Sequence, residues 1–177
     1  RGEERIPLPA ISEEQIKQFE EGRVILIDKP LHWTSFDVVR KIRNRIRIKK
    51  VGHAGTLDPL ASGLLIVCTG KFTKKINEYM AAEKEYTGSF TLGAVTPTYD
   101  LESEPEQHKD ISSVTIEAIH EAVKSFTGEI QQFPPIYSAI KKSTCFIIKY
   151  MIVFRNGMFT SKHDTYWIFS CGKTYGK

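Results

Sequence analysis

The segment from Gly52 to Gly63 constrains the fold of this chain more than any other feature. It reads Gly-His-Ala-Gly-Thr-Leu-Asp-Pro-Leu-Ala-Ser-Gly, with three glycines and one proline in twelve residues. Glycine weakens helices and strands, and proline removes a backbone hydrogen-bond donor. The segment therefore predicts a structured loop. Short apolar runs at residues 24–27 and 64–68 predict buried strands on either side of it.

Between these two strands the pattern predicts a helix with two different faces. Thr34 or Ser35 can cap its N-terminus. Residues 29–50 hold eight bases and one acid, so the helix also carries a cationic face. Such a face attracts polyanions, although a merely solvated surface is the alternative. The apolar stripe predicted to face the core consists of Phe36, Val39, Ile42 and Ile46.

The rest of the chain mixes helices and strands irregularly. A short helix near residues 13–20 is expected in the N-terminal arm, and further helices over 73–82 and 113–126. A strand is expected over 86–92 and an extended segment over 131–136. This order favours a mixed α/β domain or an α+β domain.

Length and composition narrow the class of protein. A chain of 177 residues, 41% hydrophobic and 26% charged, is typical of a soluble globular domain. No apolar run approaches the ~18 residues of a membrane span, and no secretory signal is visible. Three cysteines without a CxxC pair suit a reducing compartment. We expect a cytoplasmic monomer with no membrane association.

No metal or cofactor is expected. Thr69-Gly70-Lys71 resembles the end of a phosphate-binding loop, but Leu65 stands where that motif needs glycine. The five histidines are scattered, and no HExxH pattern is present.

Three side chains near the loop are candidates for chemistry. Asp58 can be a simple turn residue before proline, or a nucleophile or base in a loop whose glycines admit a ligand. His53 can be an ordinary loop histidine or a group that contacts the same substrate. Tyr86 can be a core or edge aromatic, or a platform on which an unstacked base lies. Lys29-Pro30 predicts a rigid turn that supports the loop.

Together these residues resemble the bacterial tRNA pseudouridine synthase B family. The resemblance is continuous over about residues 22–142, and the twelve-residue loop is its most specific part. The other matching runs are Ile25 to Pro30, Trp33 to Ser35, Lys84 to Tyr86, Leu92-Gly93, Thr96 to Asp100, Phe126 to Gly128 and Pro134 to Lys142.

The resemblance implies the pseudouridine synthase catalytic fold, which is an α/β fold of the α+β type with a mixed, largely antiparallel sheet flanked by helices and the active cleft across the sheet. It also implies an activity. The family isomerises the uridine at position 55, in the T arm of tRNA, to pseudouridine without a metal or cofactor. The resemblance implies that Asp58 is the catalytic nucleophile, that His53 contacts the displaced nucleotide, and that Tyr86 stacks on the target base. Flipping the base out of its stack is required by such chemistry. The cations then expected to contact RNA phosphates are Arg40, Arg43, Arg47, Lys49 and Lys50.

Residues 143–177 depart from the family pattern. This segment holds eight of the nineteen aromatics and shows poor periodicity. Residues 170–175 weakly resemble a family strand that supplies a tyrosine and an arginine, which implies Tyr175 as the tyrosine and puts Lys177 in the arginine's place. This departure has three alternative explanations: a frameshifted or truncated gene product, a sequence-reading error, or a diverged tail.

The expected organisation is therefore an N-terminal arm at 1–21, an incomplete catalytic domain at 22–142 and an anomalous tail. An inactive RNA-binding fragment is the alternative to an active isomerase. A structural fragment without RNA affinity is a third possibility.

Overall fold

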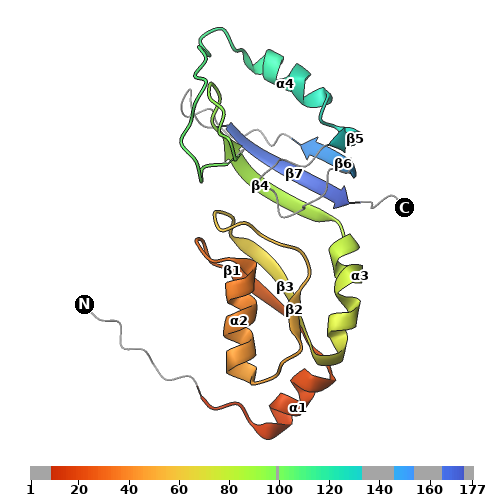
Figure 1. Cartoon of the computed structure of the whole chain (residues 1–177). Helices are drawn as coiled ribbons and strands as arrows, with labels where there is room; N and C mark the ends of the chain where they lie inside the picture. Colours follow the sequence, from red (N-terminus) through yellow and green to blue (C-terminus); the bar gives the residue numbers. More distant parts are fainter. Residues whose placement is uncertain (1–8, 99, 133–145, 154–164, 174–177) are drawn as a thin grey trace, which may run out of the picture. The chain divides into compact units, whose positions relative to one another are not determined.

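The structure is a computed structural model that describes residues 9–98, 100–132, 146–153 and 165–173 (Figure 1). The chain divides into two compact units, Arg1–Met80 and Ala81–Lys177. Each unit contains an antiparallel sheet and at least one helix. The predicted α+β class is confirmed.

Unit 1 is built on a three-stranded antiparallel sheet. Its strands are β1 (Val24–Lys29), β2 (Val51–His53) and β3 (Gly63–Thr69), in the order β1-β3-β2. The predicted strands at 24–27 and 64–68 fall within β1 and β3 and are confirmed. The prediction that the loop begins at Gly52 is wrong, because Gly52 and His53 pair with Cys68 and Val67 of β3.

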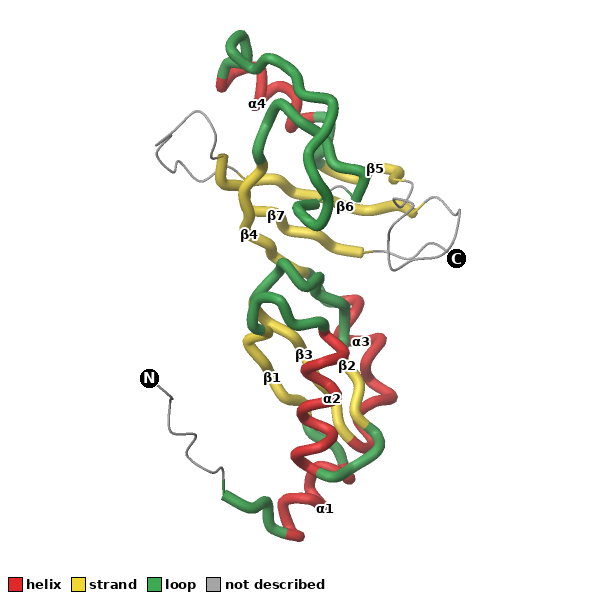
Figure 2. Tube along the Cα trace, turned by 60° about the vertical axis from the view of Figure 1, so that its left-hand side comes forward, coloured by secondary structure: helices red, strands yellow, loops and turns green. Residues whose placement is uncertain are grey.

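Helix α2 (Ser35–Ile46) packs against this sheet and closes the core of unit 1 (Figure 2). Its N-cap is Thr34, whose hydroxyl accepts a hydrogen bond from the Asp37 amide. The predicted stripe is correct for Val39 and Ile46, which are buried, and wrong for Phe36, which is 59% exposed. Val38 takes the inward position at 4% exposure. The other buried members of this core are Ile48, Val51, Leu65 and Val67.

Two further helical segments lie beside the sheet of unit 1. Helix α1 (Glu13–Glu21) begins at a capping box made by Ser12 and Gln15, close to the expected position. The helix expected over 73–82 begins instead as a 3-10 helix, η1 (Gly70–Lys75), and continues as α3 (Ile76–Ala81). The tight 3-10 turn follows β3 directly, so the chain turns without a connecting loop.

Unit 2 has a four-stranded sheet in the order β4-β7-β6-β5, with every neighbouring pair antiparallel. Helix α4 (Ile116–Lys124) is shorter than the expected 113–126, because Thr115 caps its N-terminus. The segment expected to be extended at 131–136 continues past the described residues at position 132. The strands are β4 (Lys84–Phe90), β5 (Gly128–Gln132), β6 (Phe146–Val153) and β7 (Thr165–Lys173).

The segment after residue 142, which lacks clear periodicity in sequence, supplies two of these four strands. Strand β7 lies between β4 and β6, and Phe169 is the register partner of Tyr86. The strand that carries Tyr86 is therefore paired to a segment about eighty residues later in the chain. In the part of the chain that the structure describes, no helix is long and apolar enough to cross a membrane.

Candidate functional site

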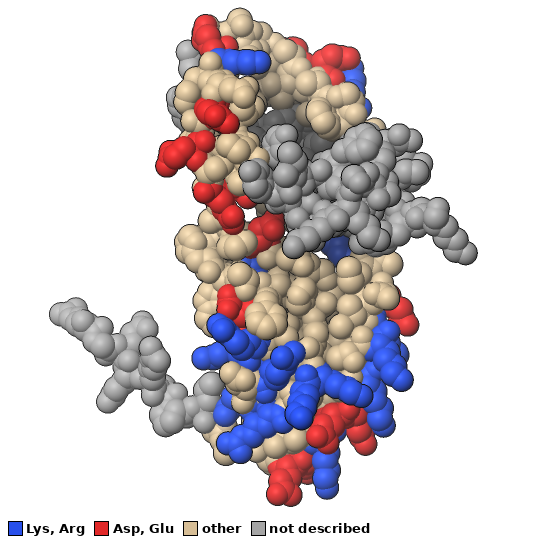
Figure 3. Space-filling view, viewed as in Figure 1, with Lys and Arg blue, Asp and Glu red and all other residues tan. Residues whose placement is uncertain are grey.

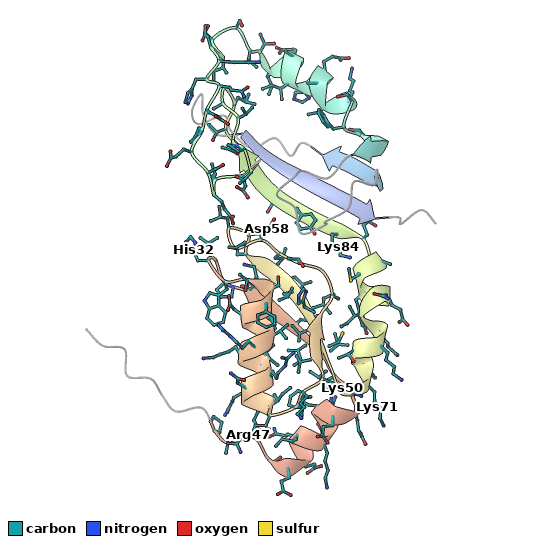
Figure 4. All side chains as sticks on the ribbon, in the orientation of Figure 1. His32, Arg47, Lys50, Asp58, Lys71 and Lys84 are labelled. Atoms are coloured by element: carbon teal, nitrogen blue, oxygen red, sulfur yellow. The ribbon has the colours of Figure 1, made fainter. Side chains whose placement is uncertain are left out.

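Asp58 lies in the loop between β2 and β3, at one end of unit 1 (Figure 4). The Ala61 amide donates to the Asp58 carbonyl over 3.0 Å, which closes a turn around Pro59. The His32 amide donates to the Pro59 carbonyl over 2.7 Å, so the β1–α2 connection holds the same turn. The Asp58 residue is exposed, and no hydrogen bond or ion pair to its carboxylate occurs among the described residues. The carboxylate is therefore free to meet a ligand.

His53 ends β2 and points its ring into the same loop segment. Its Nδ1 lies 2.7 Å from the carbonyl oxygen of Gly55. A carbonyl only accepts hydrogen bonds, so Nδ1 carries the proton in this contact. In the neutral ring Nε2 is then an acceptor, available to a donor on a substrate. His53 is half-buried, which limits the directions from which a substrate can reach it.

Lys29 is completely buried at the end of β1. Its Nζ donates to the Trp33 carbonyl over 2.6 Å and to the Pro30 carbonyl over 3.1 Å. The turn predicted at Lys29-Pro30 is confirmed, and a side chain from inside the protein closes it. Strand alternation could have revealed this, because Ile25, Ile27 and Lys29 share the face that packs on the core.

Ser35 is a second residue that supports the Asp58 loop, and the sequence did not predict this role. It is the first residue of α2 and only 2% exposed. Its Oγ accepts from the Leu57 amide over 2.9 Å and donates to the Leu57 carbonyl over 3.1 Å. Leu57 directly precedes Asp58, so a side chain of α2 holds the backbone beside the candidate nucleophile.

The candidate residues divide between the two units. Asp58 and His53 belong to one loop of unit 1, whereas Tyr86 belongs to β4 of unit 2. Tyr86 is 43% exposed. Tyr175 lies outside the described residues.

Two of the five candidate phosphate contacts are already engaged. The Arg40 guanidinium forms an ion pair with Asp37 over 2.8 Å. Arg43 is half-buried and donates from Nη2 to the Val51 carbonyl over 3.3 Å. Neither arginine meets a phosphate without giving up or sharing its present partner.

The other three candidates, Arg47, Lys49 and Lys50, belong to a larger cationic surface. The charge pattern of residues 29–50 did not predict the whole of it. The Gly70 amide donates to the Lys50 carbonyl over 2.8 Å, and the Thr69 amide donates to the Arg23 carbonyl over 2.9 Å. These bonds place η1 beside the other two cationic segments. We call the resulting surface the basic end; it lies opposite Asp58 within unit 1 (Figure 4). It comprises Arg23, Arg47, Lys49, Lys50, Lys71, Lys74 and Lys75, all of them exposed.

Figure 3 shows Lys and Arg side chains gathered over this part of unit 1. Three acids lie within three residues of these cations in the sequence, so seven positive charges have three negative sequence neighbours: Glu20, Glu21 and Glu78. In the described segments, none of the seven cations forms an ion pair. Their charge is therefore available to a polyanion.

Two pKa values in unit 1 depart from their ordinary range. The Thr34 hydroxyl and amide both donate to the Asp37 carboxylate and lower its pKa, and Arg40 lowers it further by a smaller amount. Burial raises the pKa of the Cys68 thiol in β3. Within the described ranges, no group of three or more His, Cys, Asp or Glu side chains could hold a metal ion.

Comparison with known sequences identifies relatives of this chain. The family model described as "TruB family pseudouridylate synthase (N terminal domain)" matches residues 43–162. A tRNA pseudouridine synthase B from Flavobacterium johnsoniae is 55% identical over 133 residues, covering 71% of this chain and 58% of the relative. The protein of the same name from Phocaeicola vulgatus is 51% identical over 129 residues, covering 70% and 55%. The chain thus spans little more than half the length of these relatives.

Solved structures resemble it as well. A chain in the crystal structure of a Cbf5–Nop10–Gar1 complex superposes with a TM-score of 0.63 at 30% identity, covering 90% of this chain and 43% of that one. A chain in the structure of an H/ACA ribonucleoprotein bound to a substrate RNA containing 2′-deoxyuridine gives 0.57 at 26% identity, covering 90% and 41%.

Proposed function

Because this chain belongs to the TruB family of pseudouridylate synthases, we propose that it isomerises uridine to pseudouridine at position 55, in the T arm of tRNA. The observation that supports this most directly is the Asp58 loop. Its carboxylate is exposed and has no partner among the described residues, while hydrogen bonds to the β1–α2 connection and to α2 hold the backbone on both sides of it. Such a pre-ordered group suits a reaction whose substrate must be brought to it.

The reaction exchanges one glycosidic bond for another. The bond from the sugar C1′ to N1 of uracil breaks, the base turns, and a bond from C1′ to C5 forms. The hydrogen on C5 leaves as a proton, and N1 gains one, so no oxidant or reductant is needed. Asp58 can act in two ways, by bonding covalently to the substrate or by removing a proton from the sugar. Both roles need a free carboxylate within reach of a base that has left its stack.

His53 and Tyr86 are proposed to hold the flipped nucleotide. In the neutral ring of His53, Nε2 can accept a hydrogen bond, because Nδ1 donates to the Gly55 carbonyl. Tyr86 is proposed to stack on the uracil, since this residue is 43% exposed. Stacking of one base on an aromatic ring is worth ~1–3 kcal/mol, which helps to retain a detached base during its rotation.

The basic end is proposed to bind phosphates of the RNA backbone. Arg47, Lys49 and Lys50 remain in this role, and the segments around Arg23 and Lys71 extend the surface. Arg40 is a weaker candidate because the Asp37 carboxylate offsets its charge, and Arg43 is weaker because it is half-buried and donates to the Val51 carbonyl. Contacts of this kind position RNA without reading its sequence.

A second candidate is an RNA-binding fragment without catalytic activity. The basic end alone would support this candidate, because binding of RNA phosphates requires no reactive carboxylate. The two candidates share the basic end and differ in turnover.

The deciding experiment is release of tritium from a T-arm hairpin labelled at C5 of its uridines, with Asp58→Asn as the control. C5 must lose its hydrogen when it becomes bonded to the sugar, so release reports the reaction directly. Release by the parent and none by Asp58→Asn supports an isomerase. Binding of the hairpin by a folded sample that releases no tritium supports the fragment, and absence of both release and binding contradicts both candidates.

A further inference from the structure

Ser35 connects α2 to the residue that precedes the candidate nucleophile. Its hydroxyl forms hydrogen bonds with both backbone groups of Leu57, 22 residues away in the sequence. One side chain thereby satisfies a donor and an acceptor that would have a strand partner in a regular sheet. Leu57 is also among the apolar residues packed against the core of unit 1. Side-chain packing and the Ser35 hydroxyl together fix this residue.

The geometry of the loop depends strongly on this contact. Glycines flank the turn, and Gly55 has a φ of 99° and Gly63 a φ of 116°, so the backbone on either side is conformationally permissive. The groups that fix the turn from outside the loop are the Ser35 hydroxyl at Leu57 and the His32 amide at Pro59. Asp58 lies between these two points of attachment.

At the N-terminus of α2, two neighbouring hydroxyl groups have different roles: one caps the helix and the other binds the loop. Thr34 caps the helix, since its hydroxyl accepts from the Asp37 amide. Ser35 is not needed for capping, and its hydroxyl is directed to the loop instead. A loss of either hydroxyl affects the same turn of the same helix, but only one of them touches Leu57.

We propose that Ser35 is a positioning residue for Asp58, acting through the backbone of Leu57. The proposal rests on the proposed function in one respect, that Asp58 is the reactive group. Ser35 itself contacts no substrate in this scheme. It sets where the carboxylate lies, and its loss displaces Asp58 without removing it.

The first test measures amide hydrogen exchange of the chain by NMR. In the parent, the Leu57 amide should exchange as slowly as amides of β3, although it lies outside any strand. Ser35→Ala should accelerate exchange at Leu57 by about tenfold or more, because a partly buried donor loses its partner. Ser35→Thr, which keeps the hydroxyl, should retain the protection.

Thr34→Ala is the matched control for this measurement. It should accelerate exchange at Asp37 only modestly, because that amide keeps the Thr34 carbonyl as an acceptor, and it should leave Leu57 protected. Rapid exchange at Leu57 in the parent would overturn the proposal, and this outcome needs no variant to fold. Equal acceleration at Leu57 in both alanine variants would also overturn it, because a general loosening of α2 would then explain the effect.

The second test uses the tritium-release assay in single and multiple turnover. Ser35→Ala should lower kcat about 10- to 100-fold with KM nearly unchanged, the signature of a displaced reacting group. Thr34→Ala should keep the parent kcat at a temperature where it is folded. A rise in KM with unchanged kcat in Ser35→Ala would contradict positioning. If the parent itself releases no tritium, the proposed function fails, and the exchange result still decides whether Ser35 holds the loop.

Discussion

Lys29 shows how much one residue can contribute beyond its place in a motif. Its side chain has no exposed surface, and its ammonium donates to the carbonyls of Pro30 and Trp33. A buried charge is tolerated only when such partners surround it. The same turn presents His32 in the left-handed region, at a φ of 64°, where its amide meets the Pro59 carbonyl. The buried lysine therefore shapes the turn that supports the Asp58 loop.

Lys29→Met tests this contribution. The methionine keeps most of the apolar stem but removes the Lys29 donor from both carbonyls, and the Pro30 carbonyl keeps only the Trp33 amide, so we expect a loss of ~1–3 kcal/mol in the free energy of unfolding. Urea denaturation monitored by circular dichroism measures it. Lys49→Met, on the exposed surface, should change stability by less than ~0.5 kcal/mol. Similar losses in the two variants would show that the buried hydrogen bonds of Lys29 contribute nothing specific.

Asp37 gives unit 1 a pH-dependent contribution to stability. The hydrogen bonds from Thr34 lower the pKa of this carboxyl below the 3.8 of the unfolded chain. The stabilisation is therefore complete above pH 3.8 and is lost as the pH falls through the lowered folded value. The difference in melting temperature between the parent and Asp37→Asn should shrink over that acidic interval. In a Thr34→Ala background the same substitution should show a weaker dependence on pH, and an equal dependence in both backgrounds would contradict the role of Thr34.

At the scale of the element, α2 shows what a helical pattern can and cannot predict. The cap, the cationic face and the inward positions of Val39 and Ile46 follow from composition and a period of 3.6 residues. Phe36 does not follow, because Val38 takes the inward position in the first turn. The two hydrogen bonds between Ser35 and Leu57 could not be predicted, because no local sequence pattern indicates a contact between residues 22 positions apart.

Because Val38 is buried and Phe36 is exposed, we expect the smaller side chain to contribute more to the free energy of unfolding than the larger one. Val38→Ala should cost ~1.5–2.5 kcal/mol of unfolding free energy, because it removes buried methyl groups from the core. Phe36→Ala removes a larger side chain but should cost less than ~1 kcal/mol, because that side chain is 59% exposed. Chemical denaturation of both variants measures the difference. A greater loss in Phe36→Ala would restore the stripe expected from the sequence.

At the scale of the whole molecule, the two units differ in how readily the sequence predicts them. The strands and helices of unit 1 come from clear apolar runs and recognisable caps within eighty residues. The sheet of unit 2 depends on β6 and β7, whose segment has no regular alternation in sequence. Their pairing with β5 and β4 is a property of the assembled sheet. The Asp58 loop was predictable as a motif, while the buried groups that support it emerge only from the packing.

The basic end should dominate the salt dependence of RNA binding. The double variant Lys50→Glu with Lys71→Glu should weaken binding of a tRNA and reduce the slope of log affinity against log salt concentration by about 1 per lost phosphate contact. Filter binding over a range of salt concentrations measures this slope. Lys109→Glu makes a charge change of the same kind in unit 2 and should leave the slope within error of the parent. Lys109→Glu changes the net charge half as much as the double variant, so a reduction about half as large in Lys109→Glu would assign the effect to net charge.

The pairing of β4 with β7 has a consequence for synthesis on the ribosome. Unit 1 completes its own sheet with residues that emerge early, so it can fold while the chain is still growing. Strand β4 ends at Phe90 and its partner β7 begins at Thr165, 75 residues later (165 − 90). At a synthesis rate of about 5–20 residues per second, roughly 4–15 s pass between the synthesis of β4 and that of its partner strand. During that interval the strand carrying Tyr86 is an open edge, and a nascent-chain chaperone or the growing chain itself must keep it from pairing elsewhere.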